Sequence, residues 1–185
     1  MKGKRTTYRA DLDLADAMAS HFDAPTFATA CKACRNYGKT WVCPPFDYNP
    51  EEKLKDYKKV MFFADVIDLP QGTLLNEVQA MIAPYKKEIR RRMLDMEKMT
   101  GGHSCILAGK CDDCEPLSCA RLEGNKCRHP ELSRPSLEAY GFNLSTLIDE
   151  LFGLSFTWSN NEFAPSTLIL VTAHFYSGSY VFPAD

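Results

Sequence analysis

The chain has 185 residues, of which 45% are hydrophobic and 25% are charged, and its formal net charge is −2. These proportions are those of a globular protein, and we expect residues 1–185 to form a single domain with one hydrophobic core. The near-neutral charge argues against a nucleic-acid surface, no apolar segment reaches membrane-spanning length, and the basic N-terminus lacks the apolar stretch of a signal peptide. We therefore expect a cytoplasmic protein, in which clustered cysteines indicate metal binding or catalysis rather than disulfides.

The first quarter of the chain contains two predicted helices and a loop. Four apolar residues recur at helical spacing over residues 10–22, before Pro25: Leu12, Ala15, Ala19 and Phe22. The segment 31–47 has no sustained period and is predicted to be an ordered loop rich in aromatic residues. Asn49 followed by Pro50 is typical of a helix start, so a short helix is expected to end near Tyr57.

The middle of the chain alternates strand and helix patterns. Residues 59–67 are rich in β-branched and aromatic side chains and are predicted to form a buried strand. A long helix is predicted from Thr73 to about Met99, interrupted by Pro84, and residues 103–107 should form a short strand after Gly101. The basic run 86–92 lies within this helix and is interpreted as a solvated face.

The last third adds a helix and a strand. One or two helical turns are predicted over residues 135–140, and Asn143 should cap a helix that ends at Gly153. Residues 166–176 form an apolar, β-type run. The order of these elements predicts an α+β fold with a small mixed sheet, packed helices and two cysteine-rich metal-binding loops. If the strands at 59–67 and 103–107 pair in parallel, the two loops should lie at opposite ends of the sheet; if antiparallel, at one end.

The strongest chemical signal is a cluster of four cysteines. Half of the chain's eight cysteines fall within seventeen positions, at Cys111, Cys114, Cys119 and Cys127. A C-x2-C turn presents two sulfurs to one centre, and the other two can complete a tetrahedral set of thiolates for zinc or an iron–sulfur cluster. This spacing predicts one metal centre.

A second stretch carries three more cysteines, Cys31, Cys34 and Cys43. Three thiolates leave one position of a four-coordinate centre for another ligand, and we expect a non-protein ligand there, which would make this centre reactive. Cys105, His21 or Asp47 could supply the missing ligand instead. Cys105 itself lies in a strand pattern and is interpreted as a buried structural thiol.

The identity of the metal is less constrained. Cys31/Cys34 and Cys111/Cys114 match the paired C-x2-C turns of a zinc ribbon, but this assignment leaves three clustered thiols unused. Proline directly follows Cys43, as in bacterial ferredoxin segments, which favours one or two [4Fe–4S] clusters over zinc.

These motifs resemble the DUF2284 family of predicted metal-binding proteins. The first matching signature is C-x2-C-x2-Y-G-x2-W-x-C-P-P, from Cys31 to Pro45, and the second runs from Ala108 to Cys119 and resumes from Cys127 to Gly141. The resemblance covers about a third of the chain. It implies metal binding by the seven cysteines and no particular reaction, and it leaves Cys105 outside the site.

Other residues of the second signature have simpler interpretations. Arg134 and Glu138 are four apart and would pair on a helix, and Arg134 or His129 could hydrogen-bond an anionic cluster. Tyr37 and Trp41 are interpreted as lids that keep water off the metal.

The sequence thus favours an iron–sulfur protein that transfers electrons or binds a small ligand at an open cluster site, with an unknown partner. A zinc protein with structural metal and a protein-binding surface is the alternative. A third hypothesis, a cysteine nucleophile, would need an exposed thiolate with a base nearby, and only Cys127 with His129 offers such a pair.

Overall fold

The computed structural model describes residues 4–109, 111–159 and 162–180. Its described helices are α1 (Leu14–His21), α2 (Ala24–Ala33), α3 (Pro50–Leu54), α4 (Leu75–Thr100), α5 (Leu137–Tyr140), α6 (Leu144–Phe152) and a 3₁₀ turn at Ala120–Glu123. Its strands are β1 (Arg5–Asp13), β2 (Lys59–Asp68), β3 (His103–Cys105) and β4 (Thr167–Tyr176). This arrangement confirms the predicted α+β class. None of the described helices has the length and apolar character needed to cross a membrane.

The sheet has the order β1-β2-β4-β3, and every described neighbouring pair is antiparallel. The prediction of a mixed sheet was therefore wrong. Strands β2 and β3 do run in the same direction, but β4 lies between them because it pairs with both. A long final strand can insert between two earlier ones, and no local pattern in the sequence reveals that insertion.

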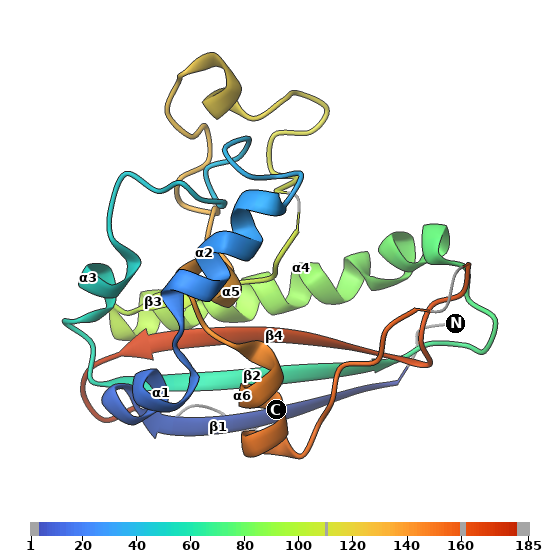
Figure 1. Ribbon diagram of the computed structural model, residues 1–185, viewed down its shortest axis with the longest axis horizontal. Helices are drawn as coiled ribbons and strands as arrows, with labels where there is room; N and C mark the ends of the chain where they lie inside the picture. Colours follow the sequence, from blue (N-terminus) through green and yellow to red (C-terminus); the bar gives the residue numbers. More distant parts are fainter. Residues whose placement is uncertain (1–3, 110, 160–161, 181–185) are drawn as a thin grey trace.

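Two layers of helix cover the two faces of the sheet (Figure 1). Alternate residues of β2 point to opposite faces, as strand geometry requires. Phe62 packs with Leu147 and Phe142 of the α5–α6 region, whereas Phe63 packs with Ile89 and Met93 of α4. The inner stripe of α4 is buried as predicted at Val78, Ile82, Tyr85, Ile89, Met93 and Met96.

The N-terminal prediction was wrong in two ways. Residues 5–13 form an edge strand paired with β2 along its length, and the helix that follows covers only Leu14–His21. Pro25, which follows the predicted helix over residues 10–22, lies in the first turn of α2, where its missing N–H has no cost. The side chain of Asp23 caps α2 by accepting a hydrogen bond from the Thr26 amide, 3.2 Å away.

Helix ends elsewhere follow the sequence signals closely. Asn49 caps α3 through the Glu51 amide, and Asn143 caps α6 through two amides. Gly101 and Gly153 end α4 and α6 with positive φ values of 67° and 63°, the conformation that favours glycine.

Candidate metal centre

The three-cysteine stretch begins on a helix rather than in a loop. Cys31 lies in the last turn of α2, and Cys34 is its C-terminal cap, with its amide bonded to the carbonyl of Cys31 at 3.0 Å. The chain then returns toward these residues, where the Cys43 amide bonds the Thr40 carbonyl. Gly38 makes this return possible because it has a φ of 70° and donates to the Pro44 carbonyl at 2.8 Å.

The four-cysteine stretch follows β3 and contains little regular structure. Cys119 is the N-terminal cap of the 3₁₀ turn Ala120–Glu123, and Gly124 ends that turn with a φ of 72°. Amides at Glu115 and Leu117 close two further turns near Cys114. The segment is thus ordered by tight turns around its cysteines.

The two stretches lie against each other, above α4 in Figure 1. The guanidinium of Arg121 donates to the carbonyl oxygens of Thr40 at 2.7 Å, of Cys43 at 2.6 Å and of Pro45. It also stacks 5.0 Å from the ring centre of Trp41, whose indole N–H donates to the Asn125 carbonyl at 3.0 Å. We call this set of contacts the Arg121 clamp.

The contact between the two stretches was not expected from the arrangement of the strands. Parallel pairing of β2 and β3 was expected to place the two loops at opposite ends of the sheet, but β4 lies between these strands, so the two do not pair. The loops meet because residues 44–58, which include α3, separate Cys43 from the start of β2 and let the first loop lie away from the end of that strand.

Electrostatic coupling joins the first three cysteines to a fourth. Burial raises the pKa of the Cys31 thiol, and the neighbouring Cys43 and Cys34 thiols raise it further. Burial also raises the pKa of Cys43, with Thr40 and Arg121 opposing this shift and Cys34 and Cys119 adding to it. Cys119 therefore lies within electrostatic range of the three-cysteine stretch.

Cys111 and Cys127 both lie near Ser133. The Cys111 thiol donates to a carboxylate oxygen of Asp113 at 3.2 Å, and the Cys127 sulfur lies 3.4 Å from the Ser133 hydroxyl. Burial raises the pKa of Cys111 to about 11, and Ser133 acts against this shift. Asp113 is also bound by Arg90, which attaches this part of the loop to α4.

The donor chemistry fits a thiolate-bound metal. All eight cysteines are free thiols, and the seven predicted ligands are half-buried or, for Cys34, exposed. In the part of the chain that the structure describes, no group of three or more His, Cys, Asp or Glu side chains is arranged to hold a metal ion. The division of the seven cysteines into two centres therefore stays a prediction. Burial raises the pKa of the Cys31, Cys43 and Cys111 thiols, so a metal that binds them must displace their protons.

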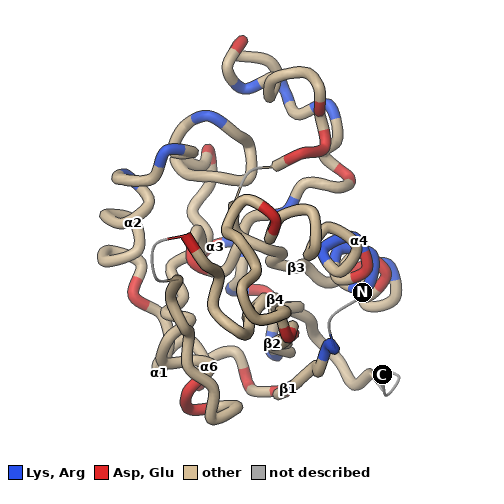
Figure 2. Tube along the Cα trace, turned by 90° about the vertical axis from the view of Figure 1, so that its right-hand side faces the viewer, with Lys and Arg blue, Asp and Glu red and all other residues tan. Residues whose placement is uncertain are grey.

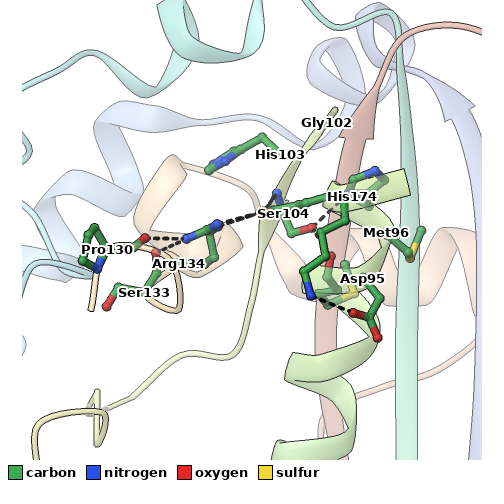
Figure 3. Close-up of polar contacts among 12 residues, drawn as sticks. Asp95, Met96, Gly102, His103, Ser104, Pro130, Ser133, Arg134 and His174 are labelled. Carbon is green, nitrogen blue, oxygen red and sulfur yellow. Dashed lines mark hydrogen bonds and ion pairs between the residues drawn. The ribbon is translucent and has the colours of Figure 1, made fainter. Parts of the chain in front are cut away.

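Arg134, a residue of the second signature, has another partner than the predicted Glu138. Arg134 does not pair with Glu138: its Nε and Nη2 donate to Glu97 on α4 at 2.8 and 2.6 Å, and its Nη1 donates to the carbonyls of Pro130 and Ser133 (Figure 3). His129 lies 3.7 Å from Glu131. The position of Glu97 within a long helix gave no sign of this contact in the sequence.

Cys105 is fully buried in the sheet, as predicted, and burial holds the pKa of its thiol well above the usual range. It packs in the core with Leu137 and Tyr140 rather than with the cysteine loops. His21 is buried on α1, where it contacts Thr146 and Glu150 of α6. Cys105 is thus surrounded by core residues and His21 by residues of α6, and both lie apart from the cysteine loops.

Sequence reasoning missed a second group of polar residues beside the cysteine loops. His103 on β3 contacts the hydroxyl of Tyr140 at 2.9 Å, and that hydroxyl lies 3.1 Å from the hydroxyl of Tyr48. The only available signal was a histidine inside an apolar strand pattern. Its partners lie 37 and 55 positions away in the sequence, so no motif connects them.

Comparison with known proteins gives one result. The model of the DUF2284 family, described as a predicted metal-binding protein, matches residues 20–171, which include all seven predicted ligands. No curated protein and no solved structure matches the chain.

Proposed function

The chain belongs to the DUF2284 family of predicted metal-binding proteins, and on this basis we propose that its seven loop cysteines hold iron–sulfur clusters that serve in electron transfer or small-ligand binding. The observation that carries the proposal is the Arg121 clamp, which holds two cysteine-bearing stretches distant in sequence against each other. A bound cluster would supply one-electron redox chemistry and, where one iron lacks a cysteine, a position for an outside ligand.

The number of thiols supports clusters over a single zinc ion. One tetrahedral zinc site uses four ligands, which leaves three of the seven thiols unexplained. Two centres use all of them. The predicted division assigns Cys111, Cys114, Cys119 and Cys127 to one centre and Cys31, Cys34 and Cys43 to the other. The coupling of Cys43 with Cys119 supports a second division, in which Cys119 completes the first stretch.

The charge around the loops also suits a cluster. A thiolate-ligated iron–sulfur cluster is anionic, and hydrogen bonds and cations near its sulfurs stabilise it. Figure 2 shows Lys and Arg residues, interspersed with Asp and Glu, in the cysteine-bearing loops and along α4. Arg121 already opposes the rise in the pKa of Cys43, because its positive charge favours the thiolate.

A structural zinc site is the second candidate. The C-x2-C pairs Cys31/Cys34 and Cys111/Cys114 match the two turns of a zinc ribbon, and the clamp brings their loops together. Leu117 and Leu122 are 64% and 58% exposed between the cysteines, which suits a protein-binding surface in this alternative.

One experiment separates the two candidates. The full chain should be purified without oxygen, and iron, acid-labile sulfide and zinc should be measured together with the visible spectrum. We expect iron and sulfide in similar amounts and a broad charge-transfer absorption that is bleached on reduction. Stoichiometric zinc without iron or sulfide would overturn the iron–sulfur proposal in favour of the zinc site.

Single variants test the ligand assignment. C31S and C111S should each lower the metal content, whereas the matched control C105A should retain it because that thiol lies in the core. C119S distinguishes the two divisions: loss of the same spectral component as in C31S assigns Cys119 to the first stretch, and loss of the C111S component assigns it to the second. Unchanged metal content in all three Ser variants would contradict the assignment.

A further inference from the structure

A polar cleft of about 560 Å³ lies between β3, α3 and the end of the four-cysteine loop. Cys127 lies on its rim, and Lys53, His103 and Lys126 are among the side chains that line it. Figure 3 shows the His103 ring on the side of β3 that faces Arg134 and the segment after Cys127. The cleft is therefore adjacent to the cysteine loops but is built from other residues.

His103 presents a free nitrogen to this cleft. Its Nε2 is engaged by Tyr140, and within the described residues its Nδ1 has no hydrogen-bond partner. The ring stacks between Tyr140 and Phe175, with ring centres 5.7 and 6.5 Å away, so its orientation is fixed. Burial lowers the pKa of His103 to about 4, with Lys53 adding to this shift, so the ring is neutral at pH 7.

The His103 ring is linked through Tyr140 to the hydroxyl of Tyr48 at the wall of the cleft. The hydroxyl of Tyr140 lies between His103 and the hydroxyl of Tyr48, which itself lines the cleft. When Tyr140 donates to Nε2, the proton of the ring is on Nδ1 and is directed toward the cleft. The Tyr48 hydroxyl can then donate to the Tyr140 oxygen, so that each of these two hydroxyls donates one hydrogen bond.

The charges of the cleft divide into a paired and an unpaired set. Glu97 and Arg134 neutralise each other in a two-bond ion pair. Lys53 and Lys126 have no carboxylate partner among the described residues, and Lys53 lies 4.8 Å from the ring centre of Tyr48. Asp47, also on the wall, has no cationic partner within the same residues. The cleft wall thus carries two ammonium groups and one carboxylate that have no ion-pair partner among the described residues.

We propose that this cleft binds a small organic acid that also carries a hydroxyl or amino group. The two ammonium groups and the Nδ1–H of His103 hold the carboxylate oxygens, because charged donors form the strongest hydrogen bonds to carboxylates. Asp47 accepts a hydrogen bond from the hydroxyl or amino group. The Tyr48–Tyr140–His103 chain is satisfied with the ring proton on Nδ1, because Tyr140 can then donate to Nε2. The proposal involves residues other than the predicted metal ligands and does not depend on which metal they bind.

The test uses the full chain, with its metal content measured, and malate as the probe. Binding is followed by calorimetry and by the imidazole nitrogen signals of His103 in NMR spectra. We expect malate to bind and to shift the Nδ1 signal, and succinate, which lacks the hydroxyl, to bind more weakly. K53M and H103Q should each weaken malate binding by about tenfold, the loss expected for one hydrogen bond to a charged group.

K58M is the matched control, since Lys58 is exposed and lies outside the cleft. It should keep the affinity for malate within about twofold, as expected for a distant surface residue. The absence of any His103 shift with malate, succinate or serine would overturn the proposal. So would equal affinity of K53M and K58M. Because metal content is recorded separately, failure here is distinguishable from failure of the iron–sulfur proposal.

Discussion

At the scale of single residues, two buried polar groups of the sheet, Asp65 and His174, contact α4. Asp65 on β2 is fully buried, and Arg92 binds both of its oxygens at 2.7 and 3.3 Å. His174 on β4 is also fully buried, and its two ring nitrogens face the hydroxyls of Thr100 and Ser104 at 2.8 and 2.9 Å. These contacts fix the register of the helix on a surface that is otherwise apolar.

The first prediction concerns the buried ion pair. R92M should lower the free energy of unfolding by about 3 kcal/mol, because among the described residues it leaves the buried charge of Asp65 with the hydroxyl of Thr7 and the more distant Arg5. Urea unfolding at pH 7 measures this loss. R91M, on the exposed face of the same helix, should change stability by less than about 0.5 kcal/mol. Equal stabilities of the two variants would contradict this interpretation.

The second prediction concerns the pH dependence of stability. Burial lowers the pKa of His174 from 6.5 to about 4, with Glu97 acting in the opposite direction. Between these values the unfolded chain binds more protons than the folded one, so the free energy of unfolding rises with pH in this window and falls on acidification. His174 should contribute a loss of about 3 kcal/mol between pH 6.5 and pH 4. Above pH 7 its contribution is constant.

Urea unfolding at a series of pH values tests this sign and window. The variant H174Q should show a shallower pH dependence between pH 6.5 and pH 4 than the original chain, whatever its stability at pH 7. His103, whose pKa is also lowered to about 4, retains its share of the slope in that variant. Parallel pH curves for the two proteins would show that His174 is not responsible.

At the scale of elements, local patterns predicted some segments well and others poorly. Helix α4 and strands β2 and β4 were predicted because their apolar periodicity, caps and lengths all agree. Strand β1 was missed because it is an edge strand with mixed exposure, and pairing with β2 overrides its weak helical spacing. Helix α2 has no buried residue among its ten, so it offers no apolar stripe to detect.

The third prediction concerns the joining of the two cysteine-bearing segments. R121K should weaken metal binding by about tenfold, because lysine cannot reproduce the planar fork that donates to the carbonyls of Thr40 and Cys43. Competition with a chelator measures the affinity. Its control is R35K, since Arg35 is exposed on the first loop and has no partner among the described residues. Undiminished affinity in R121K would show that the clamp does not hold the site together.

At the scale of the whole molecule, the sheet with its helices and the cysteine loops are built differently. The three hydrophobic clusters lie between the sheet and its helices. In segments 31–47 and 111–133, by contrast, Thr40 and Ala120 are the buried residues. The sequence identified the cysteines of this second part from their spacing alone. It could not predict their long-range interactions, such as the electrostatic effect of Cys119 on Cys43, because those depend on how two loops dock.

The fourth prediction follows from this contrast. Segments with few buried side chains depend on other interactions for order, and metal binding supplies such order when it is coupled to local folding. Removal of the metal by a chelator should therefore increase amide hydrogen exchange in segments 31–47 and 111–133. Exchange in β2, β4 and α4 should stay nearly unchanged, because their buried clusters and backbone pairs remain.

Hydrogen exchange with mass spectrometry of the metal-loaded and metal-free chain measures both parts at once. C105A provides the internal comparison: it creates a small gap in the core and should increase exchange in β3 and β4 without affecting the loops. If the sheet instead loses its protection together with the loops when metal is removed, the metal stabilises the whole domain. The apolar clusters would then be too small to hold the sheet alone, contrary to the arrangement of buried residues around β2 and β4.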